Sequence, residues 1–240
     1  MTCVVAILRL SVDTFAINLM GPPTVTHEAL QVSIGLEYSY SEENLELSDH
    51  GVTGLNKLND VRNNELIAKL GVGLLYNWEL FLCVGTSALR INEIDFDGST
   101  DFVRGIGTKV TFYRSDRFDL GALFQWSIYG GDETGFTDAV GYYAEETIDV
   151  DEQHIAIGAT MHMDGWRLYG GPFYYVFDGD VTIKEAGRPA NQVRPDLEEG
   201  AEYGAYVGGQ FDLGETTYLT VGYTNTGEGW GMGISLSRMF

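Results

Sequence analysis

The acidic stretch "NEIDFDGSTDF" (residues 92–102) carries oxygen ligands at the spacing of a calcium-binding loop. The ligand positions 1, 3, 5 and 9 are filled by Glu93, Asp95, Asp97 and Asp101. Gly98 takes position 6, where such a loop needs a sharp turn, but position 12 is Arg104 instead of a bidentate glutamate. The stretch therefore predicts either a Ca²⁺ site at these four carboxylates or an ordinary acidic hairpin tip.

A second stretch, "DVDEQH" (residues 149–154), places two aspartates close to a histidine. Carboxylate and imidazole groups that share one site can activate water for hydrolysis. The alternative is that Asp149, Asp151 and His154 are ordinary polar residues near a loop, because no second aspartate pair aligns with them.

These residues lie in a chain of repeated period-two alternation. In "RFDLGALFQWSIYG" (residues 117–130) every second residue from Phe118 to Ile128 is apolar, which predicts a β-strand with one dry face. Ten such stretches occur, at residues 29–40, 65–76, 78–90, 102–114, 117–129, 152–163, 166–178, 202–212, 215–225 and 229–240.

Short and long connections alternate between these stretches. This arrangement predicts an all-β fold, an up-and-down antiparallel transmembrane β-barrel of about ten strands, or of eight if two stretches pair otherwise. No linker divides the alternating part, so residues 29–240 are expected to form one barrel. Residues 1–28, of which the first twenty are largely apolar apart from Arg9 and Asp13, are expected to be a signal-like segment or a periplasmic N-terminal segment.

The placement of glycine indicates which face of the barrel points outward. Fourteen glycines fall on the polar face of the strands and only two, Gly170 and Gly209, on the apolar face. Glycine weakens a strand unless crowding requires it, and the narrow interior of a barrel supplies that crowding. The bulky face is therefore expected to contact lipid, in preference to a soluble barrel that turns its apolar side chains inward.

The last stretch, "GWGMGISLSRMF", ends in Phe240 on an alternating strand. With the architecture above, it resembles the small outer-membrane β-barrels of Gram-negative bacteria, the OmpA-like and OmpX-like barrels. The resemblance implies a bacterial outer-membrane location, contact with lipid and lipopolysaccharide, and insertion by the barrel-assembly machinery. It implies no single function: members include adhesins, anchors, narrow channels and surface proteases of the omptin type, which use aspartate and histidine at the rim as in residues 149–154. Arg238 departs from the pattern, since the family usually has an aromatic or aliphatic residue there.

Charged residues on the polar face are expected to line the lumen. The lumen residues predicted in this way are Glu37, Lys69, Glu79, Lys109, Asp119, His154, His162, Arg167 and Glu202. Because both signs are present, they can form a neutralising network that plugs the barrel. The alternative is a narrow water-filled path for cations.

The chain has a net charge of −21, and its long connections hold 24 of its 35 acidic residues but only 5 of its 14 basic ones. This charge excludes nucleic acid as a partner. No cofactor is expected apart from the calcium of residues 93–101. We expect a structural or recognition role through acidic external loops, in contact with other envelope proteins, with a cation-preferring channel or a rim hydrolase as alternatives.

Overall fold

The computed structural model describes residues 21–46, 57–91, 96–137, 143–185, 196–227 and 229–240. These residues form eleven strands: β1 (Val32–Glu46), β2 (Lys57–Leu75), β3 (Trp78–Ile91), β4 (Phe96–Asp97), β5 (Asp101–Arg114), β6 (Phe118–Thr137), β7 (Tyr143–Met163), β8 (Trp166–Glu185), β9 (Asp196–Asp212), β10 (Thr217–Thr226) and β11 (Gly229–Met239). Among them no helix is long and apolar enough to cross a membrane.

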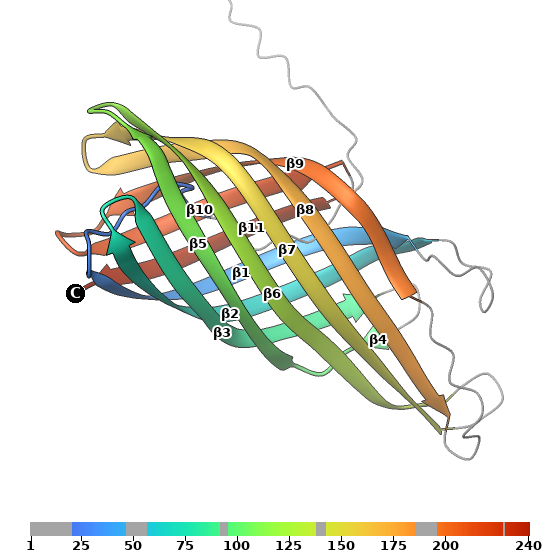
Figure 1. Cartoon of the computed structure of the whole chain (residues 1–240). Coiled ribbons are helices and arrows are strands. Elements are labelled where there is room, and N and C mark those ends of the chain that lie inside the picture. The colour runs from blue at the N-terminus through green and yellow to red at the C-terminus, as the bar shows by residue number, and fades with distance from the viewer. Residues whose placement is uncertain (1–20, 47–56, 92–95, 138–142, 186–195, 228) are drawn as a thin grey trace, which may run out of the picture.

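Ten of the strands close into one antiparallel barrel (Figure 1). Each long strand pairs with its neighbours in the sequence, and β1 pairs with β11 to complete the circle. The two-residue strand β4 pairs with β3 alone among the described residues. The predicted up-and-down barrel of ten strands is thus confirmed, and the eight-stranded alternative is not adopted.

The expected strand ends differ from the structure mainly at the ends that carry the long loops. β2 begins at Lys57 instead of residue 65, β6 continues to Thr137 instead of residue 129, and β7 begins at Tyr143 instead of residue 152. Apolar alternation ends where lipid contact ends, but the hydrogen-bond ladder continues into polar sequence. On the β6–β8 side these extensions project well beyond the rest of the barrel (Figure 1).

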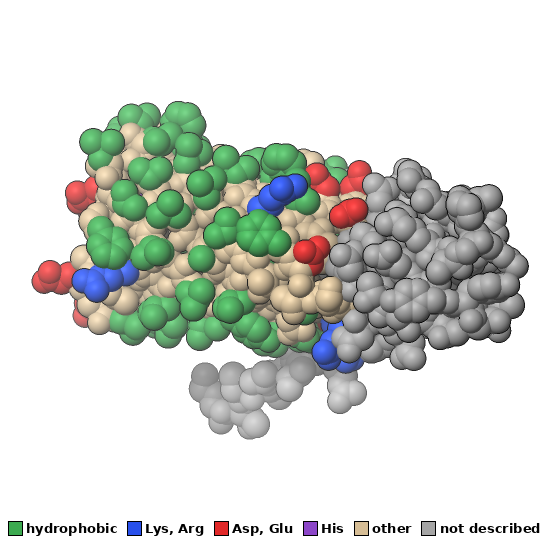
Figure 2. Space-filling model, turned by 90° about the horizontal axis from the view of Figure 1, so that it is seen from below, with side chains coloured by type: hydrophobic (Ala, Val, Ile, Leu, Met, Phe, Trp, Pro, Cys, Tyr) green, Lys and Arg blue, Asp and Glu red, His purple; other side chains and the backbone are tan. Residues whose placement is uncertain are grey.

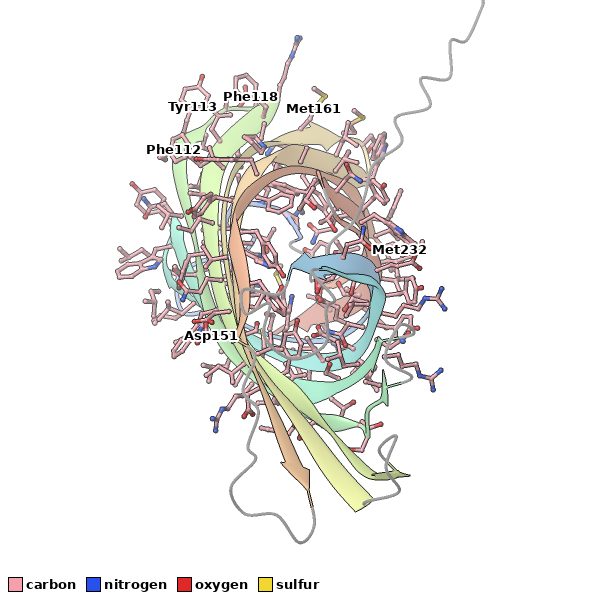
Figure 3. The ribbon with its side chains drawn as sticks, turned by 90° about the vertical axis from the view of Figure 1, so that its right-hand side faces the viewer. Phe112, Tyr113, Phe118, Asp151, Met161 and Met232 are labelled. Carbon is pink, nitrogen blue, oxygen red and sulfur yellow. The ribbon has the colours of Figure 1, made fainter. Side chains whose placement is uncertain are left out.

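Figure 2 shows apolar side chains spread over the described part of one face of the barrel, and all ten barrel strands carry exposed large apolar side chains. Leu82, Ile157 and Leu236 on three separate strands are 52%, 56% and 49% exposed, which in water would be unfavourable over so continuous a surface. Figure 3, a view along the barrel, shows labelled residues such as Phe112 and Met232 pointing away from the wall. The prediction that the bulky face points outward is therefore confirmed, and the soluble alternative is wrong.

Aromatic side chains are exposed at both ends of this apolar band. Tyr76, Phe112 and Phe240 lie at the end with the short turns, and Phe102 and Tyr223 lie toward the long loops. Amphipathic rings are typical of the two membrane interfaces. We call these two ends of the barrel the short-turn end and the long-loop end.

Candidate functional site in the barrel lumen

Residues 21–28 lie across the short-turn end of the barrel, and we call them the strap. The Thr24 hydroxyl lies 2.7 Å from the Thr160 hydroxyl on β7, and the backbone N–H of Val25 donates to Thr111 Oγ1 on β5 at 2.8 Å. Arg114 donates a hydrogen bond of 3.3 Å to the carbonyl oxygen of Val25. Residues 21–28 of the expected segment 1–28 thus contact the barrel wall, whereas residues 1–20 lie outside the described residues.

The strap is attached to β1 through a tight turn at residues 28–31. The N–H of Leu30 donates to the carbonyl oxygen of Gly73 at 2.7 Å, and the N–H of Gly73 donates to the carbonyl oxygen of Gln31 at 2.9 Å. Leu30 has a φ of 66°, in the left-handed region that residues with a side chain rarely adopt. The turn thus reverses the chain from the lumen into the wall.

Gly73 has a steric reason to be glycine. A Cβ atom added there would collide with the carbonyl group of Glu28 and with the His27 side chain. The missing side chain on β2 is therefore what lets the strap approach the wall.

A charged layer of the lumen lies directly behind the strap. His27 Nδ1 is 2.6 Å from Glu79 Oε2, and Lys109 Nζ is 3.7 Å from Glu79 Oε1. Lys69 Nζ is 2.8 Å from Glu37 Oε2, and both lysine ammonium groups lie within 6 Å of the centre of the Phe81 ring. Oppositely charged groups thus pair across the interior, as a closed lumen requires.

The outer opening at the short-turn end holds a second charged group. Asp119 accepts contacts from Arg114 Nε at 3.5 Å and from His162 Nε2 at 3.2 Å, and His162 is partly exposed to solvent. Arg167 donates to Gln210 at 2.8 Å and lies over the Tyr218 ring. These residues form the rim around the strap.

Aromatic side chains from β8 and β9 fill much of the lumen. The buried rings are Tyr169, Phe173, Tyr175, Phe177 and Tyr206, and they belong to the buried apolar core. Several of them lie over inward-facing glycines, for example Tyr169 over Gly208 and Phe173 over Gly204. A Cβ atom at either glycine would collide with the ring, so each ring packs in the space that the missing glycine side chain leaves free.

Carboxylates are buried deeper in the lumen, toward the long-loop end. Glu43, Glu65 and Glu152 all lie near Tyr129, whose hydroxyl is hydrogen-bonded to Glu152. His154 Nε2 lies 2.6 Å from Glu152 Oε1. No group of three or more potential metal ligands in metal-binding geometry occurs in the described part of the chain.

No family model matches the chain, and no curated protein matches it. The outer-membrane protease OmpT from Escherichia coli is similar over 90% of this chain and 98% of its own, with a TM-score of 0.52 and 10% sequence identity. The translocator domain of the autotransporter NalP from Neisseria meningitidis is similar over 90% of both chains, with a TM-score of 0.50 and 13% identity.

The protein is a small outer-membrane β-barrel. The exposed apolar band supplies the physical reason for its place in a bacterial outer membrane, since lipid covers that band. The likeness to OmpT and NalP concerns the fold, because the sequence identities are only 10% and 13%.

The structure separates the three residues that suggested hydrolysis at the rim of this barrel. His154 points into the lumen and is 1% exposed, whereas Asp149 and Asp151 face outward. Asp151 accepts a hydrogen bond of 2.8 Å from the Trp126 indole on the outer surface (Figure 3). The expected grouping of these aspartates with His154 is therefore not formed, because residues at odd and even positions of β7 face opposite sides of the wall.

Of the nine predicted lumen residues, Glu37, Glu79, Asp119 and His154 are buried inside the barrel, and Lys69, Lys109 and Arg167 are partly buried there. His162 lies at the short-turn opening. The backbone of Glu202 pairs with Tyr175, but its side chain lies outside the described residues.

The proposed calcium ligands are only partly described. Glu93 and Asp95 lie outside the described residues, as does the side chain of Asp97. Asp101 Oδ1 accepts a hydrogen bond of 2.6 Å from the N–H of Phe102. The calcium site stays a prediction.

Three further residues that complete the lumen, His27, Glu65 and Glu152, were not predicted from the sequence. His27 was not expected there because residues 21–28 lack alternation. Glu65 and Glu152 lie two residues from other inward-facing positions of β2 and β7, so the alternation of those strands would have identified them as lumen residues. For His27 the signal is Gly71 and Gly73, two inward glycines in succession at the end of β2 that leave room for a foreign segment.

Proposed function

We propose that the protein is a closed outer-membrane barrel that does not conduct ions and acts through its long-loop end, in a structural or recognition role. The observation that carries this proposal is the filling of the lumen. The strap crosses the short-turn end, paired charges follow behind it, and a column of rings from β8 and β9 occupies the space above.

The proposed surface role rests on the charge of the long connections. Their 24 acidic residues would repel anionic lipopolysaccharide unless divalent cations bridge the two. Lipopolysaccharide bridged in this way is the partner that we propose, together with other envelope proteins that carry basic surfaces.

Single-channel recording in a planar bilayer tests the closed barrel. We expect no steady conductance from the purified protein, with or without millimolar calcium. Sedimentation of proteoliposomes with lipopolysaccharide vesicles tests the surface role, and we expect association only when calcium or magnesium is present. Steady conductance would contradict the first part, and association that ignores divalent cations would contradict the second.

A narrow cation-preferring channel is the second candidate. It is favoured by the carboxylates Glu43, Glu65 and Glu152, which are buried together around Tyr129 inside the barrel. Reversal potentials under a potassium chloride gradient distinguish this candidate, since it requires a current carried by the cation.

The C-terminus bears on how the barrel is assembled. The N–H of Phe240 donates to the carbonyl oxygen of Val32 at 2.8 Å, and the Arg238 guanidinium lies over the Phe240 ring at 5.4 Å. The ring itself is 69% exposed. We propose that the barrel-assembly machinery recognises this exposed ring, and that Arg238 is tolerated because it stacks on it. Deletion of Phe240 is expected to reduce the amount of protein in the outer membrane.

A further inference from the structure

The strap separates two spaces at the short-turn end. A cavity of about 90 Å³, whose lining includes charged side chains, lies on its inner side, between the strap and the barrel wall. A wider recess of about 270 Å³, which includes Arg114 and Asp119, lies on its outer side. Thr26 and His27 line both spaces, so these two strap residues form the partition between them.

The inner cavity, which we call the chamber, is built for polar contents. Glu37, Lys69, Glu79 and Lys109 line it, together with serine side chains from β1 and β11. Glu37 is 3% exposed, and its Oε1 has no hydrogen-bond partner among the described residues; the same holds for Nε2 of His27, which is 6% exposed. A buried acceptor of this kind needs water or a polar solute, and the chamber has room for several water molecules.

The strap can leave without breaking the barrel. β1 begins at Val32, after the turn at residues 28–31, so none of the strand ladders includes residues 21–28. The contacts identified above are polar contacts made by the side chains of Thr24 and His27 and by the backbone of Val25, and water can replace each of them. The turn that ends at Gln31 is the natural hinge.

We propose that residues 21–28 are a displaceable strap that controls the access of water and small polar solutes from the short-turn side to the chamber. The proposal rests on the closed barrel proposed above, because a barrel open at both ends would need no such closure. Movement of the strap admits solute to the chamber, while the rings of β8 and β9 still block passage through the barrel.

The test measures how fast a thiol in the chamber reacts with a small cationic reagent. Ser235 on β11 lines the chamber, and Ser235→Cys is introduced after Cys3→Ser and Cys83→Ser have removed the native thiols. The refolded full chain is treated with aminoethyl methanethiosulfonate, and the modified fraction is followed by mass spectrometry. With the strap in place we expect slow modification.

Two strap variants are compared with a matched control. Gly73→Ala places a methyl group against Glu28, and Thr24→Val with His27→Ala removes strap contacts without touching the wall. Both are expected to raise the modification rate at least tenfold. Gly214→Ala, in a short turn at the same end where an added Cβ meets nothing within 4 Å, is expected to leave the rate unchanged.

The second strap variant keeps the test informative if Gly73→Ala fails to fold. Equal rates in the parent and the folded strap variants would overturn the proposal, as would rapid modification of the parent. Conductance of the same parent protein is recorded separately. A silent parent with equal rates would remove the strap proposal and leave the closed barrel, whereas a conducting parent would remove the closed barrel.

Discussion

His27 Nδ1 and Glu79 Oε2 lie 2.6 Å apart, and this contact joins the segment before the first strand to the inner wall of β3. Both side chains are about 4% exposed. Glu79 also contacts Lys109, so one carboxylate binds both a strap residue and a residue of the barrel wall. Loss of the Glu79 side chain and loss of the His27 side chain should therefore lower the free energy of unfolding by different amounts.

Replacing Glu79 with alanine is expected to cost more stability than replacing His27. Glu79→Ala leaves the partly buried Lys109 ammonium without its carboxylate and should lower the free energy of unfolding by about 3 kcal/mol. His27→Ala removes one contact, leaves the Glu79–Lys109 pair, and should cost about 1–2 kcal/mol. Urea unfolding in lipid vesicles, followed by tryptophan fluorescence, measures both values, and the reverse ranking would contradict the importance of the wall pair.

Gly107 and Phe81 are expected to be energetically coupled. A Cβ atom at Gly107 would meet the end of the Phe81 ring, so Gly107→Ala should lower the free energy of unfolding by about 1–3 kcal/mol through overpacking. In a Phe81→Leu background the same change should cost less, because the ring is gone. The double-mutant cycle supplies the coupling energy, and additive costs would show that the ring does not fill the space above this glycine.

A disulfide is expected to form between the strap and β7. The hydroxyls of Thr24 and Thr160 lie 2.7 Å apart, so cysteines at both positions bring two sulfur atoms within reach of a bond. The pair Thr24→Cys and Thr160→Cys, made with Cys3→Ser and Cys83→Ser, should oxidise to completion, as read from the loss of free thiols by mass spectrometry. The pair Thr24→Cys and Thr220→Cys is the control. If the Thr160 pair kept its free thiols while the control pair lost them, the strap would not lie against β7 as described.

Calcium binding at residues 93–101 is tested by titration calorimetry on the refolded protein. If the four carboxylates form a site, calcium should give a heat of binding. The double variant Asp95→Asn with Asp97→Asn should bind calcium with at least tenfold lower affinity, since both changes remove a charged ligand. Asp116→Asn, in the short turn between β5 and β6, should have no effect. Equal binding in all three proteins would assign the calcium to the acidic loops in general.

The sequence predicted the part of the fold that periodicity controls. From Phe118 to Ile128 every side chain lies on the predicted face, because contact with lipid on one side and lumen on the other imposes strict alternation. At Gly131–Thr137 the chain is still a strand, but its residues no longer alternate between apolar and polar types, so the pattern that marks a strand disappears. Hence the number of barrel strands was predictable from the sequence, but the residues at which the strands end on the long-loop side were not.

The lumen was predictable residue by residue but not as a set of partners. Lys69 and Glu37 were both expected to face inward, yet only the register of β1 and β2 brings them to 2.8 Å. The strap was missed because its contacts are made by hydroxyl, carbonyl and imidazole groups of an irregular segment. Such contacts depend on the shape of the assembled wall, which no local pattern in residues 21–28 encodes.

The extension of β6, β7 and β8 changes the kind of surface that the molecule presents away from the membrane. The last β5–β6 pair is Arg104 with Ile128, and the last β8–β9 pair is Asp180 with Asp196, while β6 and β7 stay paired as far as Thr137 and Tyr143. Within the described residues the tube therefore opens into a three-stranded ribbon whose two borders have backbone donors and acceptors without a ladder partner. A closed cylinder has no such borders. Because strand addition by an extended peptide requires such a border, we expect it at this ribbon and not on the closed cylinder below it.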